Sequence, residues 1–439
     1  MKKLNKVIQK LVIGALFIAP TAVYASTAAN TTVTNTVTVF YKDATEAQNY
    51  SGTATATFTV SLLAAAPTIV VAPTAQNTSE TTSGIEIQYT VTANANGADA
   101  YTFALSPIVA GTNLTAATAD AYSLVSASGV FNPTTGVLTL GGTTLAAQLT
   151  NGATTLTVPW DGEVAGTNAA VNGLVAGDII VLGGAEYTIA SIDNSAADTN
   201  NYTQITLTTA YAGTDLPVGT IVGERAVIKL SFTSGTLQNG ASTEDYTIAP
   251  VVTYSSLTVT ATTATVTVQR PTLAISKYVR NITTPVAGTG DITVAGATFY
   301  SSGVNGKPGD VMEYLIHIDN TVGIGASKAT NIVVSDVLPE FTSINTGSIK
   351  LLPATHSSLT GIVSGDFTTV NPATAGSAAE LATGTLCVYA GAGGDNSGTN
   401  TVVGTPCVGT GGALGPDASA LPTPIPAQRS IVVFQVTID

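Results

Sequence analysis

The chain has 439 residues, of which only 9% are charged, against about 25% in an average soluble domain. Acidic residues outnumber basic ones by 27 to 14, so the net charge at pH 7 is −13. A polyanion of this kind repels nucleic acids and anionic lipid surfaces. The composition therefore excludes nucleic acid as an expected partner, and hydroxyl and amide groups must keep the surface soluble.

The first 25 residues have the three parts of an export signal. A short apolar stretch covers residues 11–19, and a small-residue cleavage site ends at Ala25. The basic residues that precede the apolar stretch are Lys2, Lys3, Lys6 and Lys10. No later stretch reaches the roughly 18 unbroken apolar residues of a membrane helix. We therefore expect a signal peptide at residues 1–25, no membrane span after cleavage, and a secreted protein that is extracellular or at the cell surface.

Residues 26–66 predict an arm of two β-strands. Apolar and polar residues alternate over residues 32–41 and 52–63, which is the period of a strand with one apolar face. The candidate assembly residues in these apolar phases are Val37, Val39, Tyr41, Phe58 and Val60. Two strands cannot bury a core by themselves. The arm therefore either inserts into the sheet of a neighbouring subunit or folds back as edge strands of its own subunit.

Residues 67–147 and 224–270 predict a discontinuous β-sandwich, because strand-like alternation recurs in both parts. Between them, residues 148–223 contain short strands separated by Gly and Asp turns, which predicts a small inserted β-barrel. Trp160, Tyr187 and Tyr202 of this insertion either line a glycan-binding face or pack in its core. The fold class is therefore all-β, with sandwiches, an inserted barrel and an N-terminal strand arm.

Residues 271–439 predict a second sandwich, whose Lys307-Pro-Gly-Asp310 segment has the composition of a turn before a strand with Met312, Tyr314, Ile316 and Ile318 in one phase. Together with Ala329-Thr-Asn-Ile-Val-Val-Ser-Asp-Val-Leu-Pro339 and the closing Val432-Val-Phe-Gln-Val-Thr-Ile438, this pattern over residues 272–439 resembles the DUF11 conserved repeat domain of bacterial and archaeal surface proteins. The resemblance implies an immunoglobulin-like sandwich at a cell surface.

Cys387 and Cys407 are the only cysteines of the chain. An exported protein with two cysteines most often pairs them, so we expect a disulfide. A bridge across about 20 residues would contribute on the order of 3 kcal/mol to stability. A reactive thiol or a metal ligand is the alternative.

The sequence offers little for catalysis or metal binding. His317 and His356 have no Ser-His-acid or metal-ligand spacing, so we predict no enzymatic activity. Calcium is the one cofactor to consider, because loop carboxylates are hard oxygen ligands, although Asp in turns usually serves the turn itself. The candidate calcium ligands are Asp193, Asp198, Asp310, Asp319 and Asp395.

Lys277 shares a strand phase with Leu273 and Ile275, which turns its amine toward the core of the last domain. A buried Lys can form an isopeptide bond with Asn or Asp, but apolar residues occupy the inner phase of the last strand, where that partner should lie.

Taken together, these features predict a secreted structural subunit of an extracellular filament, fibre or surface layer. Its partners are identical subunits, which it joins non-covalently by strand donation from the arm to form a homopolymer. The alternative is a cell-surface adhesin that contacts glycans or a host surface through the inserted barrel.

Overall fold

The computed structural model describes residues 27–42, 48–162, 170–194, 202–285, 290–321, 328–354, 356, 358–382, 384–397, 406–415 and 428–439. The predicted signal peptide at residues 1–25 lies outside the described residues. Within them the regular structure is β-strand apart from one 3₁₀ turn, η1 (Ser364–Asp366), which confirms the all-β fold class. None of the described segments forms a helix with the length and apolar character needed to cross a membrane.

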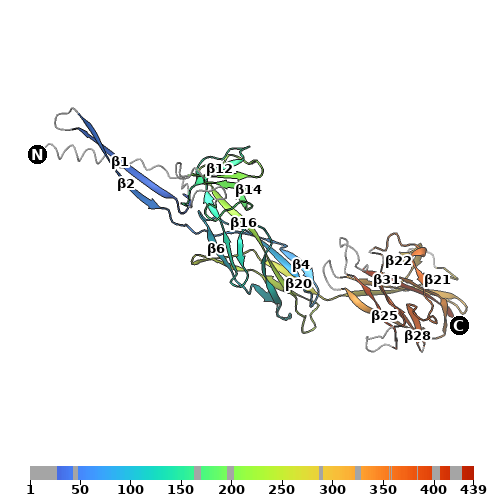
Figure 1. Ribbon diagram of the computed structural model, residues 1–439. Coiled ribbons are helices and arrows are strands. Elements are labelled where there is room, and N and C mark those ends of the chain that lie inside the picture. Colours follow the sequence, from blue (N-terminus) through green and yellow to red (C-terminus); the bar gives the residue numbers. More distant parts are fainter. Residues whose placement is uncertain are drawn as a thin grey trace.

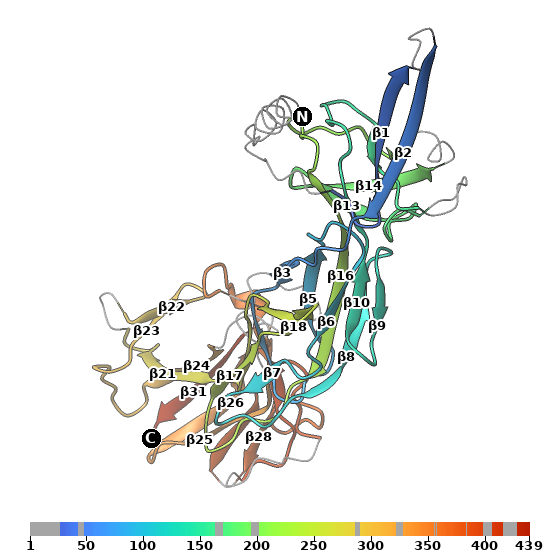
Figure 2. The same ribbon diagram turned by 90° about the vertical axis from the view of Figure 1, so that its left-hand side faces the viewer.

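The N-terminal arm is a β-hairpin that projects from the rest of the chain (Figures 1 and 2). Strands β1 (Thr32–Lys42) and β2 (Asn49–Thr59) pair antiparallel over their whole length and form a sheet of their own. The fold-back hypothesis, in which the arm supplies edge strands to its own sandwich, is therefore wrong. The two strands satisfy each other's backbone groups along one edge and leave their outer edges without a described strand.

The middle sandwich packs one aromatic core between its sheets. Strand β5 alternates strictly, with Ile87, Tyr89 and Val91 fully buried, because side chains of a strand point to opposite faces in turn. The strands are β3 (Thr68–Ala72), β4 (Ala75–Thr78), β5 (Ile85–Thr92), β6 (Asp99–Phe103), β7 (Ile108–Ala110), β8 (Thr118–Leu124), β9 (Val130–Asn132), β10 (Val137–Leu140), β16 (Ile221–Thr233), β17 (Thr243–Ile248), β18 (Val251–Tyr254), β19 (Leu257–Thr260) and β20 (Ala264–Gln269).

A small closed barrel is attached to this sandwich. Its strands are β11 (Gly142–Thr144), β12 (Thr155–Pro159), β13 (Ile179–Leu182), β14 (Ala185–Asp193) and β15 (Tyr202–Leu207), with the first part of β16. They follow the order β12-β15-β14-β13-β16, and β11 pairs with β16. The backbone N–H of Ala146 donates to the carbonyl of Thr157 at 2.8 Å, which joins the two ends of this sheet. Leucine, isoleucine and valine side chains fill the interior.

Strand β16 belongs to both units, so the boundary predicted between residues 223 and 224 needs correction. Its first residues pair with β11 and β13 of the barrel, whereas residues from Arg225 onward pair with β5 and β8 of the sandwich. The insertion also begins earlier than residue 148, because β11 belongs to the barrel and pairs Gly142 with Gly223 of β16. The sequence pattern missed this because regular alternation starts only after Glu224, whereas Val222, Gly223 and Glu224 are buried in succession.

Two carboxyl groups are buried where β16 passes from the barrel to the sandwich. Glu224 accepts hydrogen bonds from the backbone N–H of Gly141 and from the hydroxyl of Ser128, and Asp178 accepts one from the N–H of Val175. Burial raises the pKa of both acids, and the nearby Asp178 carboxylate adds to the effect on Glu224, whose pKa rises to about 7. The junction therefore holds a carboxyl group that titrates near neutral pH.

The C-terminal sandwich has a sheet ordered β21-β24-β31-β26-β27 and a second sheet ordered β28-β29-β25-β30. The strands are β21 (Leu273–Asn281), β22 (Ile292–Val294), β23 (Ala297–Phe299), β24 (Val311–Asn320), β25 (Ala329–Val337), β26 (Thr342–Leu352), β27 (Thr368–Thr369), β28 (Ala379–Ala382), β29 (Thr385–Tyr389), β30 (Gly412–Leu414) and β31 (Arg429–Ile438). Gly309 has a φ of 87° in the predicted turn before β24, a conformation that favours glycine.

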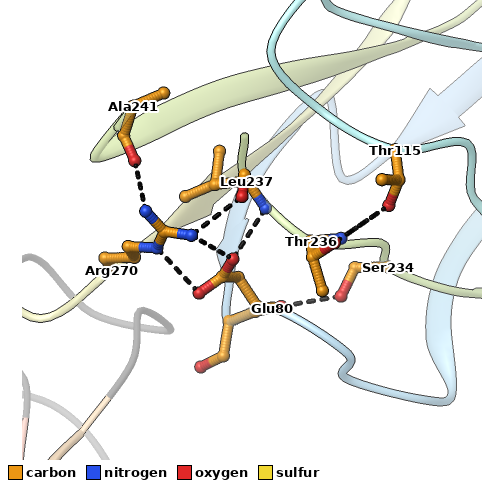
Figure 3. A network of polar contacts seen from close by, with 8 residues as sticks. Glu80, Thr115, Ser234, Thr236, Leu237, Ala241 and Arg270 are labelled. Carbon is orange, nitrogen blue, oxygen red and sulfur yellow. Dashed lines mark hydrogen bonds and ion pairs between the residues drawn. The ribbon is translucent and has the colours of Figure 1, made fainter. Parts of the chain in front are cut away.

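An ion pair holds the end of the middle sandwich where the chain leaves it for the C-terminal sandwich (Figure 3). The guanidinium of Arg270 donates to both carboxylate oxygens of Glu80, at 3.0 and 3.1 Å, and to the carbonyls of Leu237 and Ala241. The hydrogen bond from Arg270 lowers the pKa of Glu80. Arg270 immediately precedes Pro271, so this network fixes the chain at the joint between the two sandwiches.

In Figure 1 the hairpin and the C-terminal sandwich lie at opposite ends of an elongated molecule.

Candidate assembly site

The hairpin has one apolar face and one hydroxyl-rich face. Directly paired residues of antiparallel strands share a face, and Val33 pairs with Phe58. The predicted residues Val37, Val39 and Tyr41 follow Val33 on that same face. The opposite face consists mainly of threonines, and the hydroxyls of one cross-strand threonine pair, Thr36 and Thr55, lie 3.1 Å apart. The two apolar phases predicted from the sequence thus combine into a single surface.

None of the described residues covers this apolar face. Val37, Val39, Tyr41 and Phe58 are between 56% and 62% exposed, which is unusual for a row of large apolar side chains. The ring of Tyr41 stacks on that of Tyr50 at a centroid distance of 5.4 Å, so the tip of the face is a flat aromatic pair. Val60, the fifth predicted residue, lies beyond the end of β2 and is half-buried at the hairpin's base.

Asn96 clamps the base of the hairpin to the body of the protein. Its amide donates to the carbonyl of Thr27, its side-chain oxygen accepts from the N–H of Leu63, and its own carbonyl accepts from the N–H of Ala29. Both chain ends of the hairpin are thereby tied to one residue, and Ala29 is buried beside it. The sequence did not reveal this role, because an Asn-Gly pair predicts only a turn.

The structure joins Cys387 and Cys407 in the expected disulfide, with a Cα–Cα distance of 5.7 Å. Both cysteines are buried beside Tyr389, in a small cluster of their own. The carboxylate of Glu380 lies close to both sulfur atoms, but bonded sulfurs are not thiolates. This arrangement does not provide the metal ligands or the reactive thiol of the alternative hypothesis.

The candidate calcium ligands are dispersed. Asp310 immediately precedes β24, and Asp319 lies near the other end of that strand. Asp198 lies outside the described residues. The amide of Asn281 and the N–H of Lys307 hold the pKa of Asp310 below its usual value. Within the described chain, Asp193, Asp310, Asp319 and Asp395 belong to no close group of three carboxylate, histidine or cysteine side chains.

Several of these acids serve local structure. Asp319 pairs with Arg429 at 3.1 Å and accepts a hydrogen bond from Gln428. Asp395 accepts hydrogen bonds from the backbone N–H and the hydroxyl of Ser397, as expected of Asp in a turn.

The barrel aromatics do not share one environment. Tyr187 is buried in the barrel core against Tyr211 and accepts a hydrogen bond from the N–H of Ala212. The prediction that Tyr187 lines a glycan-binding face is therefore wrong, and the alternative, that it packs in the barrel core, is correct. Tyr202 on β15 is 48% exposed, and Trp160 is half-buried.

Lys277 does not enter the core as predicted. Its side chain is 42% exposed, and its ammonium pairs with the carboxylate of Asp336 at 2.8 Å and lies 4.9 Å from the centre of the Tyr314 ring. The partner acid is on β25 of the opposing sheet, whereas the sequence suggested the last strand. His317 lies on β24, and His356 lies 3.4 Å from Asp366, so the two histidines serve different parts of the sandwich.

Comparisons with known proteins do not identify a family. Neither a protein-family model nor a curated protein sequence matches the chain. Among solved structures, the C-terminal domain of the Streptococcus agalactiae AgI/II polypeptide BspA is 8% identical with a TM-score of 0.27, over 82% of this chain and 86% of that one. The C-terminal domain of the Streptococcus pyogenes antigen I/II-family protein AspA is 9% identical with a TM-score of 0.24, over 85% and 90%. Scores this low carry no conclusion about function.

Proposed function

We propose that the mature chain is a secreted structural subunit of an extracellular filament, fibre or surface layer, and that its N-terminal hairpin joins identical subunits. The observation that carries this proposal is the apolar face of the hairpin, which includes Val37, Val39, Tyr41 and Phe58 and which the described chain leaves uncovered. A contiguous exposed apolar surface of this kind marks a protein interaction site.

An isolated two-stranded hairpin is only marginally stable in water. Here Asn96 holds its base, but the strands beyond the base gain little from burial. Docking on another subunit supplies the missing burial, and the outer strand edges supply backbone hydrogen bonds. When one end of a subunit binds the other end of the next copy, the contact repeats and generates an open polymer.

Three features support an extracellular location. The first 25 residues have the pattern of an export signal, a buried disulfide is typical of oxidising compartments, and residues 272–439 resemble the DUF11 domain of surface proteins. The low charge content is also suited to subunits that pack closely against one another, because fewer charges must lose their water.

Removal of the hairpin tests this function. Replacing residues 32–59 by a short Gly/Ser linker keeps the Asn96 clamp, so the two sandwiches and the barrel should fold as before. We expect the truncated protein to sediment as a monomer at concentrations at which the full mature chain pellets as polymer. Circular dichroism and thermal unfolding of the truncated protein provide the folding control. Unchanged polymerisation after truncation would rule out the hairpin as the assembly device.

A further inference from the structure

The inner face of strand β21 lacks the cover that a sandwich normally provides. β21 is the terminal strand of its sheet, and its register pairs Ile275 with Ile318 and Lys277 with Ile316. Paired residues share a face, so Ile275 points to the same side as the core residue Ile318. Yet Ile275 is 67% exposed while Ile318 is 2% exposed. The opposing sheet therefore stops short of β21.

A groove lies between β21 and β25, where the opposing sheet leaves the inner face of β21 uncovered. Its volume is about 970 Å³, far more than the roughly 30 Å³ of one water molecule, so it can take several side chains. The Lys277–Asp336 ion pair lies between its two walls. The large apolar residues that line it include Leu273, Ile275, Ile316, Ile318, Ile332 and Val334, and the charged residues Glu80 and Lys328 line it together with the ion pair.

The outer edge of β21 also offers backbone groups for pairing. Val279 exchanges hydrogen bonds with Tyr300 at 2.9 and 3.0 Å on the edge that faces away from β24. Backbone groups of a strand alternate between its two edges, so those of Ile275 and Lys277 point to the same outer edge as those of Val279. None of the described strands pairs with β21 there. A strand added at this edge would therefore form backbone hydrogen bonds with β21 and place side chains against the apolar residues of the groove.

We infer that this groove is the acceptor for the hairpin of a second copy of the chain, with β1 added to the edge of β21. The inference rests on the proposed function. The outer half of β1 alternates Val37, Val39 and Tyr41, so a strand docked at β21 would point these three side chains into the groove and would point Thr36, Thr38 and Phe40 away from it. The molecule's own hairpin lies at the opposite end of the chain's long axis (Figure 1), so the donor is another subunit.

The buried interface area favours docking of the hairpin in the groove over a contact between two hairpins. Each strand has 11 residues, so the hairpin is about 37 Å long and about 10 Å wide. Two such faces packed together would bury about 700 Å² in total, less than the roughly 1,000 Å² that a specific interface needs. Docking in the groove buries a hairpin face and an edge at once, and adds backbone hydrogen bonds that face-to-face packing lacks.

The experiment compares Ile275→Asp with Ser276→Asp in the full mature chain. Ile275 is exposed and Ser276 is half-buried on β21 of the free subunit, and the two side chains point to opposite faces of the strand. Ser276 lies opposite His317 and not opposite an acid, so both variants should fold, which circular dichroism checks. We expect Ile275→Asp to abolish pelletable polymer, because its carboxylate would be sealed among the apolar residues of the groove. Ser276→Asp should polymerise as the unaltered chain does. Equal polymerisation of the two variants would overturn the inference.

Mixing separates this inference from the proposed function. The Ile275→Asp protein keeps its hairpin, and the protein lacking residues 32–59 keeps its groove, so each alone should be monomeric and a mixture should give one-to-one dimers by sedimentation velocity. If the hairpin-less protein is monomeric but does not dimerise with Ile275→Asp, the groove belongs to another occupant, such as a foreign peptide or a glycan, and the inference fails alone. If the hairpin-less protein polymerises, the proposed function fails as well.

Discussion

Replacing Val39 with Asp is expected to abolish assembly, whereas replacing the adjacent Thr38 with Asp should leave it intact. Val39 is 57% exposed on the apolar face, so the free subunit tolerates a carboxylate there. In the assembled state that carboxylate would be buried among apolar groups at a cost of several kcal/mol, which corresponds to at least a hundredfold loss of affinity. Thr38 lies on the hydroxyl-rich face, where the same charge stays in water.

The pair is matched because both changes replace a β-branched residue by Asp at neighbouring positions of β1, with a similar loss of strand propensity. Polymer yield as a function of protein concentration, measured by sedimentation, compares the two variants. A concentration threshold that is unchanged in both variants would contradict a role for the apolar face. An equally raised threshold in both would indicate that the lost strand stability, and not the apolar face, is responsible.

Replacing Glu224 with Gln is expected to stabilise the barrel and its junction at pH 8 by up to about 3 kcal/mol, the free energy that corresponds to a pKa rise from 4.5 to about 7, and to leave stability at pH 4 nearly unchanged. Burial raises the pKa of Glu224 to about 7, well above its usual 4.5. The folded state therefore binds the proton more tightly than the unfolded state, so the free energy of unfolding falls as pH rises from about 4.5 through 7. Gln remains neutral and avoids that loss.

Calorimetric unfolding between pH 4 and pH 8 provides the measurement. Asp178→Asn should give part of the same gain, because it removes the neighbouring carboxylate that opposes ionisation of Glu224. The two gains should add incompletely, as expected for groups that interact directly. A wild-type stability that does not change from pH 5 to pH 8 would refute a buried titrating carboxyl at this junction.

Local alternation predicts much of the fold. Side chains of a strand alternate with period two, so the phases of residues 32–41 and 52–63 correctly predicted that Val37, Val39, Tyr41 and Phe58 share the apolar face of the hairpin, whereas Val60 lies beyond the end of β2. The same period is seen in β5, where Ile87, Tyr89 and Val91 are buried in the core of the middle sandwich. The turn at Gly309 and the partner of Cys387 also follow from short-range chemistry and from residue counts.

Long-range pairing could not be predicted in the same way. Alternation puts Ile275 and Lys277 on the inner face of β21, but it cannot reveal that the opposing sheet stops short and leaves them exposed. Likewise, the alternation of β16 breaks at the junction, where Val222, Gly223 and Glu224 are buried in succession, so the sequence revealed neither that the strand belongs to both units nor that Glu224 is buried. Whether β1 pairs with β2 or with a sandwich depends on competing sheets, not on the strand's own residues.

Electron microscopy of the full mature chain, secreted and purified without denaturant, tests the central claim most directly. A structural subunit that joins end to end through its hairpin should appear as fibres or sheets with a regular repeat, and the protein lacking residues 32–59 should appear as single particles under the same conditions. Monodisperse single particles of the full chain at every concentration would contradict the account.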